Sequence, residues 1–304
     1  MPASETPIRR AAFIGLGVMG EPMCRNLTIK RQSIGLEDVR AFDLRPDPLQ
    51  RLADAGAVAA ASAAEAAADA DAVFVSLPGG KEVEAILCGD DGLLSVMKPG
   101  AVFVDLSTSP VTLSRELAAK AQARGIAYAD APVARTRQAA EQGTLAIMVG
   151  GSPEIFARIE PLLNCFASDV LHCGDVGCGQ MVKILNNMVL FQNVVALSEA
   201  LTIARHAGMD GDVLFNALTN GSGDSFALRN HGIKALLPGV FPEQAFSTVY
   251  AQKDLSYALE LADDIDRTLP GAENVKALFE KTVDAGFGDN YWPAVINVID
   301  RASD

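Results

Sequence analysis

Basic charge is scarce in this sequence of 304 residues, which has 25 lysines and arginines against 38 aspartates and glutamates and a formal net charge of −13. A nucleic-acid-binding protein needs a basic surface to meet phosphate groups, so no nucleic-acid partner is expected. An anionic substrate would need positive charge gathered locally in its binding site. The sequence also lacks a run of about 18 apolar residues, so no membrane span is expected.

Cysteine and histidine are sparse as well. The five cysteines are Cys24, Cys88, Cys165, Cys173 and Cys178, an odd number with irregular spacing that is typical of reduced thiols in a cytoplasmic protein. The last two could begin a metal site, but the chain has only 3 histidines and no second cysteine pair, so no metal is expected. The N-terminal apolar stretch is short and rich in glycine, which indicates a strand and loop rather than a signal peptide.

Short apolar runs alternate with helical patterns through the first half of the chain. Strands are expected at 11–14, 39–42, 72–77, 101–106, around Tyr128 and at 145–149. Helix-start signals between them are Ser62 with Glu65, Ser109 with Pro110, and Ser152 with Pro153. This alternation predicts the α/β class, with an N-terminal Rossmann-type doubly wound parallel sheet.

The second half of the chain is helical in pattern. Residues 180–206 contain no helix breaker and predict one long helix, and further helices are expected at 210–219, 252–265 and 271–285. A cluster of glycines marks the expected boundary between a dinucleotide-binding domain at 1–175 and a helical substrate and oligomerisation domain at 176–304. The long helix would join the two domains.

Three glycines follow the first expected strand and precede a helix, in the pattern Gly15-Leu16-Gly17-Val18-Met19-Gly20. Gly15 permits a tight turn, Gly17 lets the backbone approach a pyrophosphate, and Gly20 lets the helix pack close to the sheet. The helix N-terminus then offers N–H groups and a partial positive charge to the phosphates. The loop therefore predicts a dinucleotide cofactor.

Asp43 closes the second expected strand, where a carboxylate can accept hydrogen bonds from the adenosine ribose hydroxyls. A 2′-phosphate there would meet like charge, so NAD is favoured. Arg45 could still accommodate a phosphate, which leaves NADP open. A plain turn residue is the alternative role for Asp43.

Hydride transfer needs a group that gives or takes a proton. His172, His206 and His231 each have a setting more typical of a structural residue. Lys183 is the better candidate, because apolar neighbours could lower the pKa of its amine if it enters a cleft. Asn186 and Asn187 lie one turn further along the same helix. From these residues alone, a lysine lying along an amphipathic helix would be the favoured interpretation.

Taken in order, these motifs resemble those of the β-hydroxyacid dehydrogenase family, of the 3-hydroxyisobutyrate dehydrogenase and tartronate semialdehyde reductase type. The resemblance covers nearly the whole chain. It rests on the extended glycine signature, which runs from Gly15 to Leu27, and on Leu77-Pro78 with Val83, Asp105 to Thr108, Asp130 to Val133, Gly177 to Asn187, and Lys253 to Leu255.

The resemblance implies a role for each matched residue. Lys183 would be the general acid/base. The implied cofactor contacts are Gly15, Gly17, Val18, Met19, Gly20, Asp43, Leu77, Pro78, Val83, Thr108 and Lys253. The implied substrate contacts are Thr108, Asn186 and Asn187, together with the loop that follows Val133. It also implies a homodimer or homotetramer.

That loop departs from the family pattern. The family usually has Ser-Gly-Gly where this chain has Ala134-Arg135-Thr136, followed by Arg137. The variant is similar to the loop of sulfolactaldehyde reductase, and arginine suits oxyanions. The resemblance thus implies a small, doubly anionic 3-hydroxy acid, similar to sulfolactaldehyde or sulfolactate, or to tartronate semialdehyde. Alternatively, the arginines pair with local acids such as Glu141 or face solvent.

The sequence is compatible with three other functions, each of which is less favoured. An ordinary 3-hydroxyisobutyrate dehydrogenase is disfavoured because an arginine beside a methyl group would be buried without a partner. Imine reductases on this scaffold generally replace the catalytic lysine, so Lys183 argues against that activity. A non-catalytic binding module would not be expected to keep Lys183, Asn187 and Lys253 together.

Overall fold

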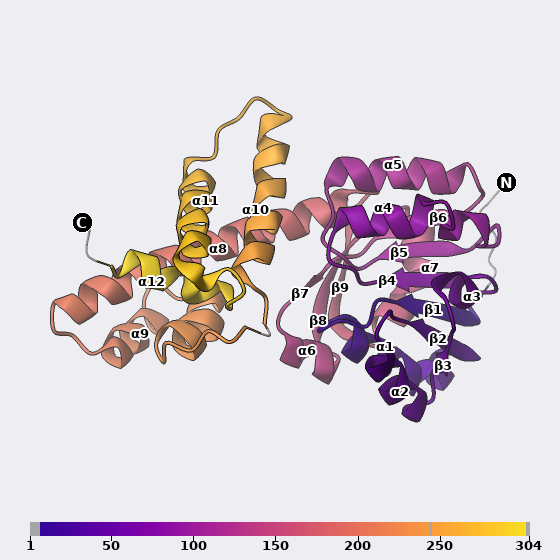
Figure 1. Ribbon diagram of the computed structural model, residues 1–304, viewed down its shortest axis with the longest axis horizontal. Helices are drawn as coiled ribbons and strands as arrows, with labels where there is room; N and C mark the ends of the chain where they lie inside the picture. The colour runs from indigo at the N-terminus through magenta and orange to yellow at the C-terminus, as the bar shows by residue number, and fades with distance from the viewer. Residues whose placement is uncertain (1–6, 244, 302–304) are drawn as a thin grey trace. The chain divides into compact units, whose positions relative to one another are not determined.

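The computed structural model describes residues 7–243 and 245–301. The chain divides into two compact units, one ending at Lys183 and the other beginning at Ile184. The first unit contains a mostly parallel sheet with helices, and the second contains a group of helices (Figure 1). The α/β class with a helical C-terminal part is therefore confirmed.

The strands of the described residues form one sheet. They are β1 (Arg10–Ile14), β2 (Asp38–Phe42), β3 (Val58–Ala59), β4 (Ala72–Val75), β5 (Val102–Asp105), β6 (Ala127–Asp130), β7 (Val133–Ala134), β8 (Leu145–Gly150) and β9 (Ala167–Gly174). Their order is β3-β2-β1-β4-β5-β6-β8-β7, with β9 beside β8. The pairs from β3 to β6 are parallel, so the carboxyl ends of β1, β4 and β5 meet at one edge.

The strands expected from continuous apolar runs are all present. The expectations omitted β3, β7 and β9. The first two have two residues each, too few to show a pattern. The third has one fully buried residue and polar residues within it, so it lacks the apolar run that marks a buried strand.

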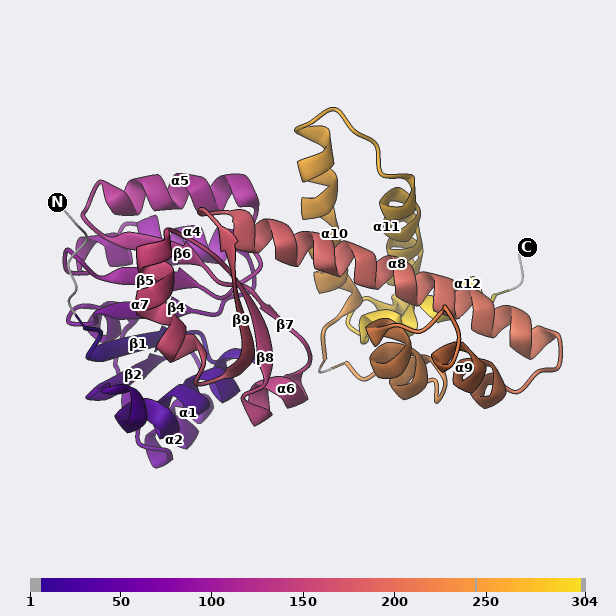
Figure 2. The same ribbon diagram turned by 180° about the vertical axis from the view of Figure 1, so that it is seen from behind.

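Two layers of helices cover the sheet. They are α1 (Gly20–Lys30), α2 (Pro46–Asp54), α3 (Ala63–Ala67), α4 (Gly80–Cys88), α5 (Val111–Gln122), α6 (Arg137–Gln142) and α7 (Pro153–Leu163), with 3₁₀ turns η1 (Arg31–Ile34) and η2 (Leu93–Ser95). Successive residues of β1 alternate between two cores. Phe13 packs with residues of α1 and α7, whereas Ile14 packs with residues of α3, α4 and α5. Figure 2 shows the helices of both layers beside the strands.

Two of the three helix-start signals are confirmed. Ser62 accepts a hydrogen bond from the Glu65 N–H at 3.0 Å, and Ser152 accepts one from the Ile155 N–H at 3.4 Å. Ser109 does not cap its helix, because its hydroxyl donates instead to a buried carboxylate. Pro110 is the N-cap of α5.

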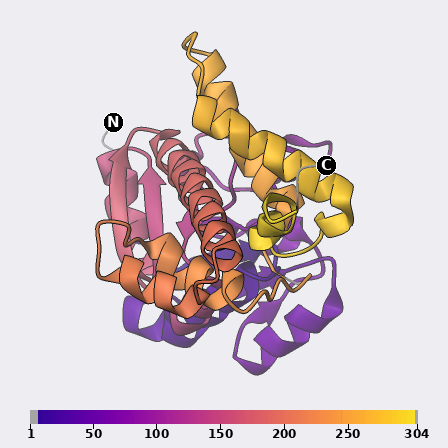
Figure 3. The same ribbon diagram turned by 90° about the vertical axis from the view of Figure 1, so that its left-hand side faces the viewer.

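The second unit contains most of α8 (Cys178–His206), and then α9 (Gly211–Thr219), the π-helix η3 (Leu228–Leu236), α10 (Thr248–Asp263), α11 (Pro270–Thr282), the π-turn η4 (Val283–Phe287), the 3₁₀ turn η5 (Trp292–Val295) and α12 (Ile296–Ile299). The long helix is one uninterrupted element, as predicted. Helices α10 and α11 form a hairpin (Figure 3). Trp292 is buried at the centre of this unit, with its ring centroid 4.9 Å from that of Phe191.

Helix α8 is, among the described residues, long and apolar enough to cross a membrane by length and composition. A core helix of a soluble protein meets the same test, and 44% of its apolar window is already buried inside the structure. The absence of a membrane partner therefore stays a prediction.

Candidate cofactor and active site

The glycine loop has the shape that a dinucleotide requires. Gly15 has a φ of +89°, and a Cβ added to it would overlap the carbonyl oxygen of Ser76. A Cβ on Gly20 would overlap the carbonyl oxygen of Gly15, so α1 starts close against the loop. A Cβ on Gly17 would meet nothing within 4 Å. The loop is therefore tightly packed beneath and open above, which fits a pyrophosphate lying over Gly17.

Asp43 lies directly behind this loop and binds it. Its Oδ2 accepts a hydrogen bond from the Leu16 N–H at 2.6 Å, and its Oδ1 accepts one from Arg45 Nε at 3.1 Å. Arg45 Nη2 also donates to the Leu16 carbonyl at 2.9 Å. Burial would raise the pKa of Asp43, but the hydrogen bonds from Arg45 and Leu16 outweigh burial and lower it. The carboxylate stays ionised, as an acceptor of ribose hydroxyls must.

Glu21, in the first turn of α1, would repel a bound phosphate, but an arginine neutralises its charge. Arg51 donates to both carboxylate oxygens of Glu21 at 2.7 Å. This hydrogen bonding is the main reason why the pKa of Glu21 is lowered. The pair leaves little net negative charge near the phosphate position.

The loop after β4 is tied to the loop after β5. The Leu77 N–H donates to the Ser107 hydroxyl at 3.0 Å, which places Pro78 and Thr108 at neighbouring strand ends. Val83 lies on the buried face of α4, with 0% exposure. Its predicted cofactor contact stays a prediction, and this burial does not favour it.

Two buried carboxylates lie side by side at the ends of β5 and β6. Asp105 accepts hydrogen bonds from the Ser107 N–H and the Ser109 hydroxyl, each at 2.8 Å. Asp130, its register partner, accepts from the Gly177 N–H at 2.7 Å and so binds the turn that starts α8. Burial raises the pKa of each carboxyl to about 6. Asp130 therefore links the end of β6 to the helix that carries Lys183, and Asp105 fixes the loop that follows β5.

Lys183 lies in the second turn of α8, partly exposed, between the exposed Val182 and the fully buried Ile184. Asn187 is four residues further, on the same face of the helix. The spacing predicted for the lysine and the amide is therefore present on one regular helix.

Within the second unit, Asn187 is almost fully buried, at 3% exposure, and donates to Asp254 at 2.8 Å. Asn186 donates in turn to the Asn187 side-chain oxygen at 3.3 Å. Lys253 forms an ion pair with Asp254 at 3.0 Å and lies over the rings of two tyrosines, Tyr250 and Tyr257. Asp254 was not among the predicted site residues, although it stands inside the matched Lys253 to Leu255 motif.

The loop after β7, which is predicted to contact the substrate, has partners within its own unit. Ala134 pairs with β8, and Arg135 follows with a φ of +85°, which is rare for a residue with a side chain. Arg135 donates to the Thr144 carbonyl at 2.6 Å, to the Ser168 hydroxyl at 2.7 Å and to Asp169 at 2.6 Å. The sequence analysis did not predict that Arg135 would contact these three residues.

The other two polar residues of this loop belong to the start of α6. Thr136 is the N-cap, and its hydroxyl accepts from the Ala139 N–H at 3.4 Å. Arg137 pairs with Glu141 at 2.9 Å, which is the alternative partner considered for it. On the neighbouring helix, Asn26 of the glycine signature donates to the Ala140 carbonyl at 2.9 Å, so it fixes α6.

Each histidine contacts residues of its own unit. His172 hydrogen-bonds the Gly151 carbonyl at 2.7 Å, and His206 lies 3.3 Å from Asp300. The ring of His231 is buried and bonded to the Tyr291 hydroxyl at 2.6 Å, and burial lowers its pKa to about 4. These settings suit the structural role that was predicted.

Among the described residues, no group of three or more metal-ligating side chains gathers.

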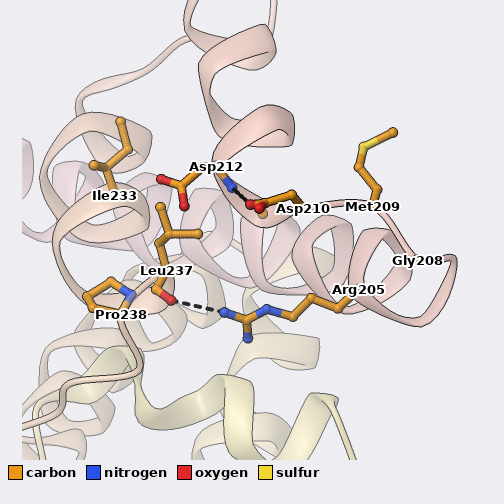
Figure 4. A pocket seen from close by; sticks show the side chains of 9 residues that line it. Arg205, Gly208, Met209, Asp210, Asp212, Ile233, Leu237 and Pro238 are labelled. Atoms are coloured by element: carbon orange, nitrogen blue, oxygen red, sulfur yellow. Dashed lines mark hydrogen bonds between the residues drawn. The ribbon is translucent and has the colours of Figure 1, made fainter.

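A cavity of about 820 Å³ lies in the second unit, at the end of α8 (Figure 4). Arg205 borders it and donates to the Leu237 carbonyl at 3.0 Å, and the Asp210 carboxylate accepts from the Asp212 N–H at 2.8 Å. None of the predicted site residues lines this cavity.

Comparison with known proteins gives matches along both units. A family model described as the NAD binding domain of 6-phosphogluconate dehydrogenase matches residues 10–174, and one described as NAD-binding of NADP-dependent 3-hydroxyisobutyrate dehydrogenase matches residues 177–299. The chain is 36% identical to 2-(hydroxymethyl)glutarate dehydrogenase of Eubacterium barkeri, over 95% of this chain and 94% of that protein. It is 36% identical to 3-hydroxyisobutyrate dehydrogenase of Pseudomonas aeruginosa, over 88% and 90%.

A solved structure has the same fold over almost the whole chain. It is the 3-hydroxyisobutyrate dehydrogenase of Mycobacterium tuberculosis with L-serine, with a TM-score of 0.85 and 33% sequence identity. The match covers 97% of this chain and 100% of that one.

Proposed function

Because the chain belongs to the β-hydroxyacid dehydrogenase family, whose members are NAD(P)-dependent dehydrogenases of CH–OH groups, we propose that it moves a hydride between NAD and a small 3-hydroxy acid. Lys183 is the proposed general acid/base. The observation that carries the proposal lies within the first unit. At one edge of one sheet, the open glycine loop packs against Ser76 at the end of β4, and the loop after β4 is bonded to Ser107, which precedes Thr108. At the same edge, Asp130 binds the start of the helix that bears Lys183.

The cofactor supplies the hydride acceptor when it is bound. Lys183, as a neutral amine, would take the hydroxyl proton during oxidation and return it during reduction. Asn186 and Asn187 would hold the hydroxyl and carboxylate of the substrate, and Thr108 and Lys253 would lie against cofactor and substrate. Asp43 would hold the adenosine ribose.

We further propose that the substrate carries a second anionic group, which Arg135 and Thr136 recognise. The positive φ of Arg135 supports this, because strained backbone is retained mainly at functional sites. The Nε atom of Arg135 makes no hydrogen bond to the described part of the chain, which leaves its N–H for an oxyanion. The Eubacterium barkeri relative is named for a substrate with a second carboxylate.

Ordinary 3-hydroxyisobutyrate dehydrogenase activity is the second candidate. The observation that favours it is that both arginines of the loop already have acidic partners, Asp169 for Arg135 and Glu141 for Arg137. Neither guanidinium would then be left without a partner beside a methyl group.

A matched pair of alcohols tests the proposal. 2-(Hydroxymethyl)glutarate and 3-hydroxyisobutyrate share the hydroxymethyl and carboxylate groups and differ in a carboxyethyl against a methyl substituent. The initial rate of NADH formation would be measured with each alcohol. The initial rate of NADH oxidation would be measured with sulfolactaldehyde, tartronate semialdehyde and methylmalonate semialdehyde. Preference for the doubly polar compounds supports the Arg135 site. Equal or faster rates with the methyl compounds would favour the second candidate, and no turnover of any would refute the dehydrogenase proposal.

We also propose that the chain forms a homodimer or homotetramer in the cytoplasm. Leu185, Val189 and Ile203 are exposed at helical spacing along α8, at 39%, 52% and 70%, and so form an apolar face of the kind that subunit interfaces cover. All five cysteines are free thiols, as is usual in a reducing compartment. Light scattering during size-exclusion chromatography would give the number of subunits, and a monomer would contradict the proposal.

A further inference from the structure

The side chain of Gln180 lies fully buried between the loop after β5 and the first turn of α8, with 0% exposure. Its Nε2 donates to the Ser107 carbonyl at 2.8 Å, and its Oε1 accepts from the Ser109 N–H at 3.1 Å. These two groups belong to the peptide bonds on either side of Thr108. The amide of Gln180 therefore holds the backbone of Thr108 from both sides.

The chemistry of this contact suits glutamine. A carbonyl oxygen needs a donor and an N–H needs an acceptor, and only a neutral amide or a protonated acid offers one of each at this reach. The orientation of the amide is fixed by the same requirement, since a flipped amide would oppose two donors and two acceptors. An ionised glutamate would leave the Ser107 carbonyl facing like charge.

The backbone of the same residue is fixed at the start of α8. The Gln180 N–H donates to Asp130 Oδ2 at 2.7 Å, and the other oxygen of that carboxylate binds the Gly177 N–H at 2.7 Å. The carboxylate thus satisfies N–H groups that the first turn of a helix leaves without partners. Lys183 follows Gln180 by three residues, about 4.5 Å along the helix axis. One residue therefore binds the segment of Thr108 and begins the turn that leads to Lys183.

We propose that Gln180 is a positioning residue for the reaction, which sets the backbone of Thr108 in place against the turn of α8 that bears Lys183. This inference rests on the proposed function, since it assigns Thr108 and Lys183 to the reacting centre. Catalytic groups that are misplaced by about 1 Å can lose about 100-fold in rate. Loss of the Gln180 amide should therefore lower kcat far more than it changes KM.

The test compares Gln180→Met, which keeps the length of the side chain and removes both bonds, with Gln180→Glu. Gln122→Met, at an exposed site in the same unit, is the control. With the best substrate of the panel above, kcat of Gln180→Met should fall by about 10- to 100-fold while KM for NAD changes by less than about threefold. The kcat of Gln180→Glu relative to Gln180→Met should rise as pH is lowered, because a protonated glutamate regains the donor.

A second readout needs neither cofactor nor turnover. Hydrogen exchange of the Ser109 amide, followed by NMR or mass spectrometry, should become roughly tenfold faster in Gln180→Met, because its hydrogen bond is lost. Lys183→Ala should leave this exchange unchanged. Wild-type kcat or unchanged Ser109 exchange in Gln180→Met would overturn the positioning role. Absence of activity in the wild type would instead overturn the proposed function, and full activity in Lys183→Ala would overturn the catalytic role of Lys183. In either case the exchange result would still test the contact between Gln180 and Ser109.

Discussion

The buried carboxylate of Asp254 accepts a 2.8 Å hydrogen bond from the side-chain amide of Asn187. Its other oxygen lies 3.0 Å from the Lys253 ammonium, so one residue orients an amide and a cation that are both predicted to meet substrate or cofactor. Asp254 is 3% exposed, and a buried carboxylate in such a position is costly unless its partners stay in place.

Replacing Asp254 by Asn should therefore lower kcat/KM by about 10- to 100-fold, because hydrogen bonds and ion pairs with a charged group contribute about 1.5–3 kcal/mol. The asparagine keeps an acceptor for Asn187 but places an N–H group toward Lys253. Steady-state kinetics would measure the loss, with Asp263→Asn at an exposed site on the same helix as the control. An Asp254→Asn enzyme with wild-type kcat/KM would contradict this role.

Removing the Lys183 amine should abolish turnover while leaving cofactor binding intact. Lys183→Ala should lower kcat by about 100-fold or more, since general acid/base catalysis contributes about 10²–10⁴-fold. The fluorescence of bound NADH would give the cofactor Kd, which should stay within about threefold of wild type if the fold is unchanged. The control is Lys276→Ala, because Lys276 is half exposed and pairs with Glu280 on α11. Unchanged turnover in Lys183→Ala would refute its assignment.

Asp43 should decide how strongly the enzyme prefers NAD to NADP. In Asp43→Asn the negative charge that opposes a 2′-phosphate is lost, while Arg45 remains beside the site. The kcat/KM for NAD should fall about tenfold, and the ratio of kcat/KM for NAD over NADP should fall further. Asp47→Asn, an exposed residue of α2, is the control. If the ratio of kcat/KM for NAD over NADP in Asp43→Asn equals that of wild type, Asp43 stabilises the loop and does not bind the ribose.

The sequence predicted those parts of the site whose residues are close together along the chain. Gly15, Gly17 and Gly20 lie within one turn, and Lys183 and Asn187 lie on one face of one helix, so spacing predicted these local arrangements. The catalytic role of Lys183 came from the family resemblance and stays a prediction. The α/β class was predictable for the same reason, because buried parallel strands are continuous apolar runs.

Partners that are distant in sequence could not be predicted in this way. Arg135 meets Asp169 across 34 residues, and Asn187 meets Asp254 across 67. Gln180 had no motif signal of its own, since its role depends on the loop after β5 folding back onto α8. Such contacts depend on tertiary packing, which a single sequence does not display.

The paired acids Asp105 and Asp130 should make folding stability depend on pH. Burial raises the folded-state pKa of each from 3.8 to about 6, so between these values the folded protein binds more protons than the unfolded chain. Their contribution to the free energy of unfolding therefore decreases as pH rises from about 4 to about 6, and then levels off. Proximity of the two carboxylates adds to the shift for Asp105.

Replacing Asp105 by Asn removes one of these ionisations while keeping the shape. Relative to wild type, Asp105→Asn should gain about 1–2 kcal/mol in unfolding free energy between pH 5 and pH 7.5. Urea unfolding at the two pH values would measure this, with Asp91→Asn at an exposed site as the control. The same difference from wild type at both pH values would show that Asp105 does not titrate in this range.

Arg135 tests whether the loop after β7 selects a second anionic group. Arg135→Gly removes the guanidinium and also relieves the positive φ of +85°, which glycine adopts without strain. The variant loses the ion pair with Asp169 and the hydrogen bonds to Thr144 and Ser168, each worth about 1 kcal/mol, and it gains about 1 kcal/mol or more from the relieved backbone strain. The free energy of unfolding should therefore fall by no more than about 2 kcal/mol.

The main effect of Arg135→Gly should be on the preference between substrates, measured as a ratio of kcat/KM values. If Arg135 binds the second carboxylate, the kcat/KM ratio of 2-(hydroxymethyl)glutarate over 3-hydroxyisobutyrate should fall at least about tenfold in Arg135→Gly. Asp169→Asn should raise the same ratio, because it removes the carboxylate that competes for the guanidinium. Arg137→Ala, which breaks only the pair with Glu141, is the control. An unchanged ratio in both Arg135→Gly and Asp169→Asn would mean that Arg135 only stabilises the loop through its ion pair with Asp169. The methyl-bearing 3-hydroxyisobutyrate would then be the favoured substrate.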